Sequence, residues 1–251
     1  MRKALFLPIL LSAVLAAQSV IDYDQTYTGE GQRLYDKQHR GVPFSGEVRF
    51  YYKNGKLKEQ SSYRNGIKEG HSTTWHKNGT KKEEGSYQNG KKEGIFTRWY
   101  TNGQKRSEIG FHNGKRDGET KLWYKSGEKR LIYHFKNGKY DGENISWYPN
   151  GQIKEITHYQ NGSKEGAYSY YSKEGKPLEK ATFLHHRKHG LHEMWYSNGQ
   201  KKVEHTFKNG VLDGRERIWF SNGQLQHDVV FKNGQRQNGG HYWQENGKQV
   251  Q

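Results

Sequence analysis

The sequence predicts an all-β protein, built as an elongated, twisted single-layer antiparallel meander. Three observations predict it. Glycines recur at steps that alternate between 11 and 13 residues, which gives a 24-residue period, and two columns of aromatic residues share that period. The segments between the glycines are about seven to nine residues long, which is ordinary strand length. Each repeat therefore supplies two strands and two turns, and contacts only its neighbours, as in a solenoid.

Most of the recurring glycines follow an asparagine. Asn-Gly favours the two positive φ angles of a two-residue type I′ hairpin turn, whose twist matches that of antiparallel strands. We therefore expect two such turns in every repeat. The glycines assigned to these turns are Gly55, Gly66, Gly79, Gly90, Gly103, Gly114, Gly127, Gly138, Gly151, Gly162, Gly199, Gly210, Gly223, Gly234 and Gly247.

Three columns of residues run through the repeats. The first holds Tyr51, Trp75, Trp99, Trp123, Trp147, Tyr171, Trp195, Trp219 and Trp243. The second holds Tyr63, Tyr87, Phe111, Phe135, Tyr159, Phe183, Phe207 and Phe231. The third holds Gly46, Gly70, Gly94, Gly118, Gly142, Gly166, Gly190 and Gly214.

Pairing the strands around the turn at Ser126-Gly127 predicts which residues face each other. Trp123 is then opposite Arg130, and Gly118 is opposite Phe135, whose ring would cover the bare glycine backbone. The two aromatic columns lie on opposite faces in this register. A bulge in the longer strand would instead bring both columns to one face.

The composition excludes a large aliphatic core. Only 30% of the 251 residues are hydrophobic, whereas 14% are aromatic, and 42 Lys and Arg against 26 Asp and Glu give a net charge of +16. The absence of cysteine excludes disulfides and thiolate metal sites. Paired lysines and arginines after both kinds of turn predict that both long edges of the ribbon are cationic.

The first residues are typical of a secretory signal peptide, which we assign to residues 1–17. A basic Arg2-Lys3 pair precedes an apolar stretch over residues 4–13, and small residues follow. The apolar stretch is shorter than the roughly 20 residues that a membrane-spanning helix needs, which disfavours an uncleaved anchor. We expect export to the periplasm, the medium or the cell surface.

The remaining chain divides into two parts. Residues 18–45 keep fragments of the repeat phase, at Tyr27 and Gly31, and are expected to form a degenerate N-terminal cap. Residues 46–251 form an array of about nine repeats.

The repeat resembles the MORN repeat. The resemblance lies in the segment from Phe111 to Gly118, and in its variant form in Trp-Tyr-x-Asn-Gly at 99–103 and 195–199 and in Tyr/Phe-x-Asn-Gly-x-x-Asp/Glu-Gly at 87–94 and 207–214. It is closest to the bacterial variant of YwqK-like antitoxins. A second glycine of ordinary MORN repeats is replaced here, for example by Thr120 and Asn144.

The resemblance implies a non-enzymatic repeat protein without a cofactor. YwqK-like proteins are antitoxin or immunity partners of toxins, and other MORN proteins associate with membranes or act as scaffolds. We therefore expect an exported antitoxin that neutralises a toxin by binding and occlusion. The alternative is an envelope or cell-surface protein that binds an anionic lipid, a glycan or a host surface; export disfavours nucleic acid as a partner.

The expected binding surface combines the tryptophans with the cations that follow the first turn, because aromatic and cationic side chains dominate protein interfaces. Its residues are Trp75, Trp99, Trp123, Trp147, Trp195, Trp219, Trp243, Lys82, Arg106, Arg130, Lys154 and Lys202.

Two other motifs are expected to be structural. The histidine-rich run from His185 to His192 could suggest a metal site, but its first two residues occupy the position of a turn, so no metal is expected there. Acidic residues one position before the glycine column, such as Glu93 and Asp117, recur once per repeat. They are expected to balance nearby lysines and not to form a catalytic pair.

Overall fold

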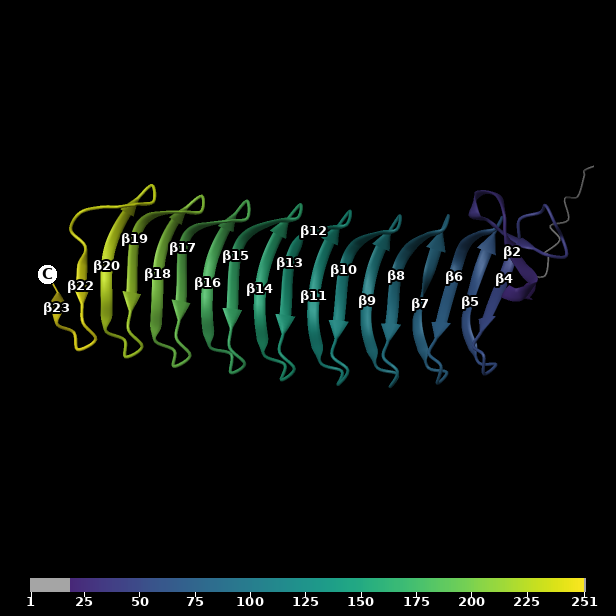
Figure 1. Ribbon diagram of the computed structural model, residues 1–251, viewed down its shortest axis with the longest axis horizontal. Helices are drawn as coiled ribbons and strands as arrows, with labels where there is room; N and C mark the ends of the chain where they lie inside the picture. Colours follow the sequence, from purple (N-terminus) through teal and green to yellow (C-terminus); the bar gives the residue numbers. More distant parts are fainter. Residues whose placement is uncertain (1–18, 251) are drawn as a thin grey trace, which may run out of the picture.

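A computed structural model describes residues 19–250, most of which form one long row of strands, while a separate two-stranded sheet lies in the N-terminal segment (Figure 1). The predicted signal peptide lies outside the described residues. The N-terminal elements are β1 (Val20–Asp22), η1 (Tyr23–Gln25), β2 (Thr26–Thr28), η2 (Glu30–Gln32) and β3 (Leu34–Asp36). None of the helices in the described part of the chain has the length and apolar character that crossing a membrane requires.

The repeats contain the remaining strands. They are β4 (Gly46–Tyr51), β5 (Leu57–Arg64), β6 (Ile67–Trp75), β7 (Lys81–Gln88), β8 (Lys91–Trp99), β9 (Lys105–His112), β10 (Lys115–Trp123), β11 (Lys129–Lys136), β12 (Lys139–Tyr140), β13 (Gly142–Trp147), β14 (Ile153–Gln160), β15 (Ser163–Tyr171), β16 (Pro177–Leu184), β17 (Arg187–Trp195), β18 (Lys201–Lys208), β19 (Val211–Trp219), β20 (Leu225–Lys232), β21 (Gln235–Arg236), β22 (His241–Trp243) and β23 (Gln249–Val250).

The predicted fold class is confirmed. From β4 onward each strand pairs antiparallel with the one that follows, in a single open layer, except that β12 with β13 and β21 with β22 each occupy one strand position. One pairing was not expected from the sequence: β1 runs parallel to β4, with Val20 beside Glu47.

The turns that precede the glycine column are the predicted two-residue type I′ turns. Asn65 and Gly66 have φ angles of 50° and 74°, and their flanking residues Arg64 and Ile67 are paired. His185 and His186 adopt the same geometry, with φ angles of 50° and 64°. The prediction that these histidines replace Asn-Gly in a turn is confirmed.

The turns that follow the tryptophan column differ from the prediction. Tyr124 and Glu128 close a three-residue loop, because the Tyr124 amide donates to the Glu128 carbonyl (2.9 Å) and the Gly127 amide to the Tyr124 carbonyl (3.0 Å). Only the glycine of each such loop has positive φ. The asparagine has another role: Asn102 Oδ1 accepts the amide of Gln104 at 3.3 Å. The prediction of a type I′ turn here was therefore wrong.

The longer loop shifts the strand register by one residue beside it. Trp123 pairs with Lys129 and not with Arg130 as predicted, because a bulge separates Leu122 from Trp123. Further along the same strands, the predicted pairing of Gly118 with Phe135 is confirmed.

The glycine column has a backbone cause that differs from the predicted one. Gly118 has a φ of 77°, and a Cβ placed on it would meet nothing within 4 Å, so the Phe135 ring does not cover it. On its other side the strand carries a large bulge, since Arg116 pairs with Phe111 but Thr120 pairs with Ile109. The glycine supplies the positive φ of this bulge.

The described part of the segment predicted as a cap at residues 18–45, namely residues 19–45, packs on the first repeat. Leu34 and Phe44 form a hydrophobic cluster with Val48 of β4. The amide of Gly66 donates to the Phe44 carbonyl at 2.7 Å, and the Leu34 amide donates to the Gly66 carbonyl at 2.9 Å. The first turn is thereby held between Leu34 of β3 and Phe44, which lies in the loop that precedes β4.

The bulge account predicts the effect of Gly118→Ala. Because the new methyl group meets no atom, the cost is that of left-handed backbone alone, and we expect a loss of about 1–2 kcal/mol of unfolding free energy. Urea denaturation followed by circular dichroism measures it, with Lys115→Ala at an exposed position of the same strand as the control. An unchanged midpoint for Gly118→Ala would contradict the bulge explanation.

Candidate binding surface

The sheet has two faces with different chemistry. The phenylalanine face carries the second aromatic column together with mid-strand residues such as Phe96, which is 1% exposed and whose ring lies edge-on to that of Phe111 at 5.4 Å. The tryptophan face carries the first column. Alternation along β8 places Phe96 and Trp99 on opposite faces, so the predicted separation of the two aromatic columns holds.

Lysines beside the tryptophans are held by carboxylates. Lys81 Nζ lies 5.6 Å from the centre of the Trp99 ring and 2.5 Å from Glu84. Lys201 repeats this arrangement beside Trp219, at 5.7 Å, with two glutamates in reach. All seven tryptophans of the predicted surface are partly buried. The tryptophan face is therefore an aromatic row in which lysines such as Lys81 and Lys201 are neutralised, while Lys180, 6.0 Å from the centre of the Trp195 ring, has no carboxylate within ion-pair distance among the described residues.

The predicted binding set is divided between the two faces. Arg130 lies 5.8 Å above the ring of Tyr124, and not beside Trp123, because of the register shift. The same stacking places Arg106, Lys154 and Lys202 over Tyr100, Tyr148 and Tyr196, at 5.8, 5.8 and 5.4 Å. These tyrosines belong to the phenylalanine face: the Tyr148 hydroxyl is 3.4 Å from that of Tyr170, which lies on that face. The expectation of one combined surface was wrong.

These tyrosines also connect the repeats, a role that the sequence analysis missed. Each hydroxyl donates to the backbone carbonyl of the first-column residue in the next repeat. The pairs are Tyr52 with Trp75 (2.7 Å), Tyr100 with Trp123 (2.8 Å), Tyr124 with Trp147 (2.9 Å), Tyr148 with Tyr171 (2.8 Å) and Tyr196 with Trp219 (2.8 Å). The signal was present as a tyrosine directly after most first-column residues.

The repeated carboxylates make a second connection between repeats. Glu93 accepts the backbone amide of Asn113 at 2.8 Å, and Asp117 accepts that of Asn137 at 2.8 Å. The hydrogen bond from the Asn113 backbone amide, together with one from the His112 side chain, holds the pKa of Glu93 below its ordinary value. The carboxylates thus hold the next turn in place. The expectation that they balance lysines is corrected, since the amide of the turn is the partner common to these positions.

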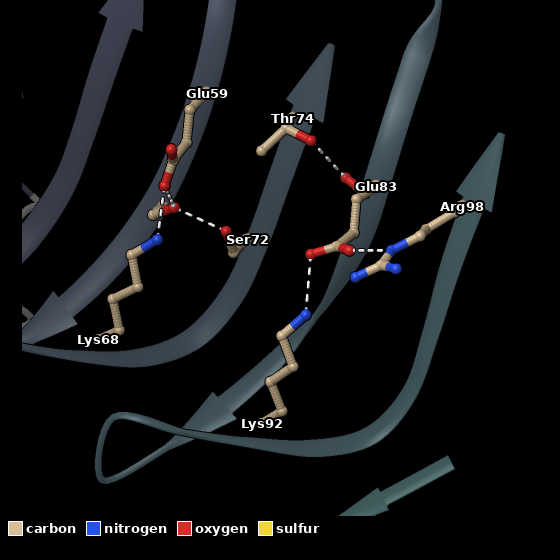
Figure 2. Close-up of polar contacts among 8 residues, drawn as sticks. Glu59, Lys68, Ser72, Thr74, Glu83, Lys92 and Arg98 are labelled. Atoms are coloured by element: carbon tan, nitrogen blue, oxygen red, sulfur yellow. Dashed lines mark hydrogen bonds and ion pairs between the residues drawn. The ribbon is translucent and has the colours of Figure 1, made fainter. Parts of the chain in front are cut away.

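A chain of polar contacts replaces a hydrophobic core on the phenylalanine face. Figure 2 shows Glu83 between Lys92, at 3.0 Å, and Arg98 of the next strand. Burial raises the pKa of Glu83, but the hydrogen bonds from Arg98 and Lys92 outweigh burial and lower the pKa below its ordinary value. The preceding repeat keeps the lysine contact, with Lys68 at 2.5 Å from Glu59, while the Ser61 hydroxyl is the other donor to that carboxylate.

The histidine run is divided by the fold. His185 lies in an exposed turn and pairs with Glu165 at 2.7 Å, whereas His192 is buried on the phenylalanine face and lies 2.9 Å from Glu179. Burial lowers the pKa of His192 despite this contact. Among residues 19–250, no three His, Cys, Asp or Glu side chains are grouped so that they could hold a metal ion.

The tyrosine connections predict opposite effects for two substitutions. Tyr124→Phe leaves the Trp147 carbonyl without its donor, and we expect a loss of about 1 kcal/mol in unfolding free energy. Phe220 occupies the equivalent position in a later repeat, so Phe220→Tyr adds the missing hydroxyl and stabilises by up to about 1 kcal/mol. Urea denaturation of both variants measures the effects. A loss of stability in Phe220→Tyr would refute the proposed role of the tyrosine hydroxyls in connecting the repeats.

The polar chain predicts a pH-dependent effect of Glu83→Gln. A carboxylate with a lowered pKa stabilises the fold above its unfolded pKa, near 4.3, and loses this contribution as the pH falls through the folded value. We expect Glu83→Gln to cost about 1–3 kcal/mol near pH 7. The difference from the parent protein should shrink below about pH 4. Denaturation across this range is the measurement, and a constant difference would contradict the assignment.

Comparison with known proteins agrees with this repeat geometry. The sequence model of the MORN repeat variant matches residues 44–65, 68–89, 92–113, 116–137, 140–161, 188–209 and 212–233. The strands over 163–184 keep the same register although no match covers them, and this is the stretch in which His185-His186 replaces Asn-Gly. A search of curated proteins finds no match. Because the seven matches cover more than half of the chain, it belongs to the MORN repeat variant family.

Proposed function

We propose that this protein is a non-catalytic scaffold that binds a partner protein through its tryptophan face. The observation that carries the proposal is the row of seven partly buried tryptophans, which lie on alternate strands from β6 to β22 except that Tyr171 takes this position on β15. Strands in a sheet lie about 4.8 Å apart, so indoles on consecutive members of the row are spaced by roughly 10 Å along the ribbon, apart from the gap at Tyr171. Tryptophan is among the residues most enriched in binding hot spots.

The surroundings of the tryptophans suit a protein partner. Exposed aliphatic side chains lie on the same face, with Ile95, Leu191 and Val230 at 66%, 48% and 49% exposure. Several of the cations beside the indoles, such as Lys81 and Lys201, are already paired with carboxylates, which reduces the free charge of this amphipathic face. Apolar anchors among satisfied polar groups are the anatomy of a protein interface.

The finer proposal is that the partner is a toxin and that the protein is an exported antitoxin or immunity protein. It is supported by the resemblance to YwqK-like antitoxins and by the signal peptide predicted at residues 1–17. Inhibition would occur by occlusion, with a few tryptophans buried at the rim of the toxin's active site. Binding to an anionic membrane or surface is the competing proposal, and it predicts many weak, salt-sensitive contacts.

Paired substitutions at two places along the row test the proposal. We expect a toxin to contact only a few repeats, so one of the double variants Trp99→Ala/Trp123→Ala and Trp219→Ala/Trp243→Ala should lose at least about tenfold in affinity while the other is nearly unchanged. Each variant serves as the control for the other, and circular dichroism confirms that both fold. The measurement is capture of partners by immobilised residues 18–251 from the envelope and medium of the source organism.

The salt dependence separates the two proposals. A toxin should stay bound at near-equal stoichiometry when the salt rises from about 0.15 M, where the screening length is roughly 8 Å, to about 0.5 M. Expression of the captured protein should then inhibit growth unless this chain is co-expressed. Loss of all bound material at the higher salt, with equal effects of both double variants, would overturn the toxin proposal.

A further inference from the structure

A row of cations runs along the phenylalanine face, beside the three-residue loops. It consists of Lys58, Lys82, Arg106, Arg130 and Lys154, which we call the cation row. Its members lie on alternate strands, β5, β7, β9, β11 and β14, because β12 and β13 share one position in the sheet. Two strand spacings separate neighbours, so the charges recur at roughly 10 Å and the row extends over about 40 Å.

The cation row is not neutralised within the protein. Across residues 19–250, no carboxylate lies within ion-pair distance of any of its five members. Some lysines nearer the centre of the same face differ, since Lys92 and Lys188 each contact a glutamate. Within the described residues, the cation row is therefore a continuous line of unpaired positive charge on this face, and Arg116 and Lys164, which lie over Phe135 and Phe183, add unpaired charge nearer the centre of the strands.

The positions of these cations are fixed by the repeat. Four of the five cations lie over the ring of a tyrosine in the same repeat. The distances from the charged group to the ring centre are 6.0, 5.8, 5.8 and 5.8 Å for Lys58, Arg106, Arg130 and Lys154. Each of those tyrosines is anchored by its hydroxyl to the next repeat. A ligand that binds such pre-positioned groups loses less side-chain entropy than one that binds free lysines.

The side-chain hydrogen bond to the next repeat and the cation are present or absent together. Where Ser172 replaces the tyrosine, Leu178 replaces the cation six residues later, and where Phe220 replaces it, Gln226 does so. His76 retains the contact to the carbonyl of the next repeat, at 3.1 Å, and its cation, Lys82, is retained. Charge needed only for solubility would not require this coupling.

Polar hollows adjoin the row on the phenylalanine face. One, of about 370 Å³, is lined by Thr74, His76, Arg98 and two members of the row, Lys82 and Arg106. Another has Lys154 at its edge and includes Asn144, Ser146 and Thr157. These hollows offer hydroxyl, amide and cationic groups beside the charged line. Each also contains one carboxylate: Glu83 in the first, which is paired with Lys92 and Arg98, and Glu155 in the second. Hydroxyl-rich ligands are recognised by this combination of groups.

We propose that the cation row binds one linear acidic polysaccharide, whose chain lies across the strands along the ribbon. One carboxylate or sulfate of the polymer pairs with each cation, and its sugar hydroxyls enter the hollows. The single file and wide spacing favour this occupant: a nucleic acid strand carries a charge every 3.4 Å or so, and most of its phosphates would remain unpaired. A bilayer presents headgroups in a plane, whereas the row follows the twist of the sheet. This site is independent of the proposed tryptophan-face function.

Hyaluronan oligosaccharides of increasing length are the probe, because they carry one carboxylate per disaccharide. Calorimetry with residues 18–251 should show affinity that rises with length until the oligosaccharide spans the five repeats and then levels off. The affinity should also fall as salt increases, since each ionic contact releases a counterion. Affinity that does not depend on length would refute binding along a row.

Charge reversal locates the site. Arg106→Glu/Arg130→Glu should lower the affinity for the longest oligosaccharide by at least about tenfold. Lys115→Glu/Lys139→Glu makes the same change in net charge at the opposite edge of the sheet and should change it by less than about twofold. Equal losses in the two variants would show that only overall charge matters and would overturn the proposal.

A gain-of-function variant keeps the test independent of folding defects. Leu178→Lys places a cation between Lys154 and Lys202. The affinity should therefore rise for oligosaccharides long enough to extend past the five protein repeats of the cation row, and stay unchanged for shorter ones. An unchanged affinity at every length would contradict the proposal that the polysaccharide binds along the cation row. Phosphatidylglycerol vesicles and oligo(dT) are compared in parallel; tighter binding of either one, with the same dependence on Arg106 and Arg130, would replace the polysaccharide with that ligand.

Discussion

Hydrogen bonds from one repeat to the next are the interaction on which this fold depends. A domain normally buries its elements between two packed layers, but this ribbon has a single layer and exposes both faces. Beyond the strand ladders, three kinds of side-chain bond join neighbouring repeats. At one edge a tyrosine hydroxyl such as that of Tyr124 and an asparagine amide such as that of Asn102 each reach a carbonyl, and at the other edge a carboxylate such as Glu93 accepts a turn amide. Each kind joins residues at a fixed separation along the chain, which accounts for the uninterrupted 24-residue period.

The single layer also explains why so polar a chain folds. A half-buried charge is stable only if opposite charges and hydrogen bonds offset its desolvation. Glu83 meets this condition because Lys92 and Arg98 of the neighbouring strand β8 both contact it, and its pKa lies below the ordinary value although burial acts in the opposite direction. Such ion-paired groups occupy mid-strand positions that an aliphatic core would fill in a two-layer protein, so a hydrophobic content of 30% suffices.

The sequence was sufficient to predict the period, the strands, the separation of the aromatic columns and the pairing of Gly118 with Phe135. It was not sufficient to distinguish the two turns, because Asn-Gly occurs in both. Asn113 has a φ of 50° and its amide is held by Glu93, whereas the side chain of Asn102 caps its own loop and reaches the carbonyl of Lys125 in the next repeat. The turn type thus depends on contacts 20 or more residues away. The resulting one-residue error in register placed Arg130 beside the wrong aromatic ring.

The separation of the predicted binding residues onto two faces follows from the same dipeptide that joins the repeats. Trp123 and Tyr124 are consecutive, so the pleat directs the indole to one face and the phenol ring to the other. The Tyr124 hydroxyl fixes the backbone that carries Trp147, while its ring supports Arg130. One side chain therefore positions an indole of the tryptophan face and a cation of the phenylalanine face. The two rows keep a common spacing for this reason, and ligands on opposite faces can bind at the same time without competing for a residue.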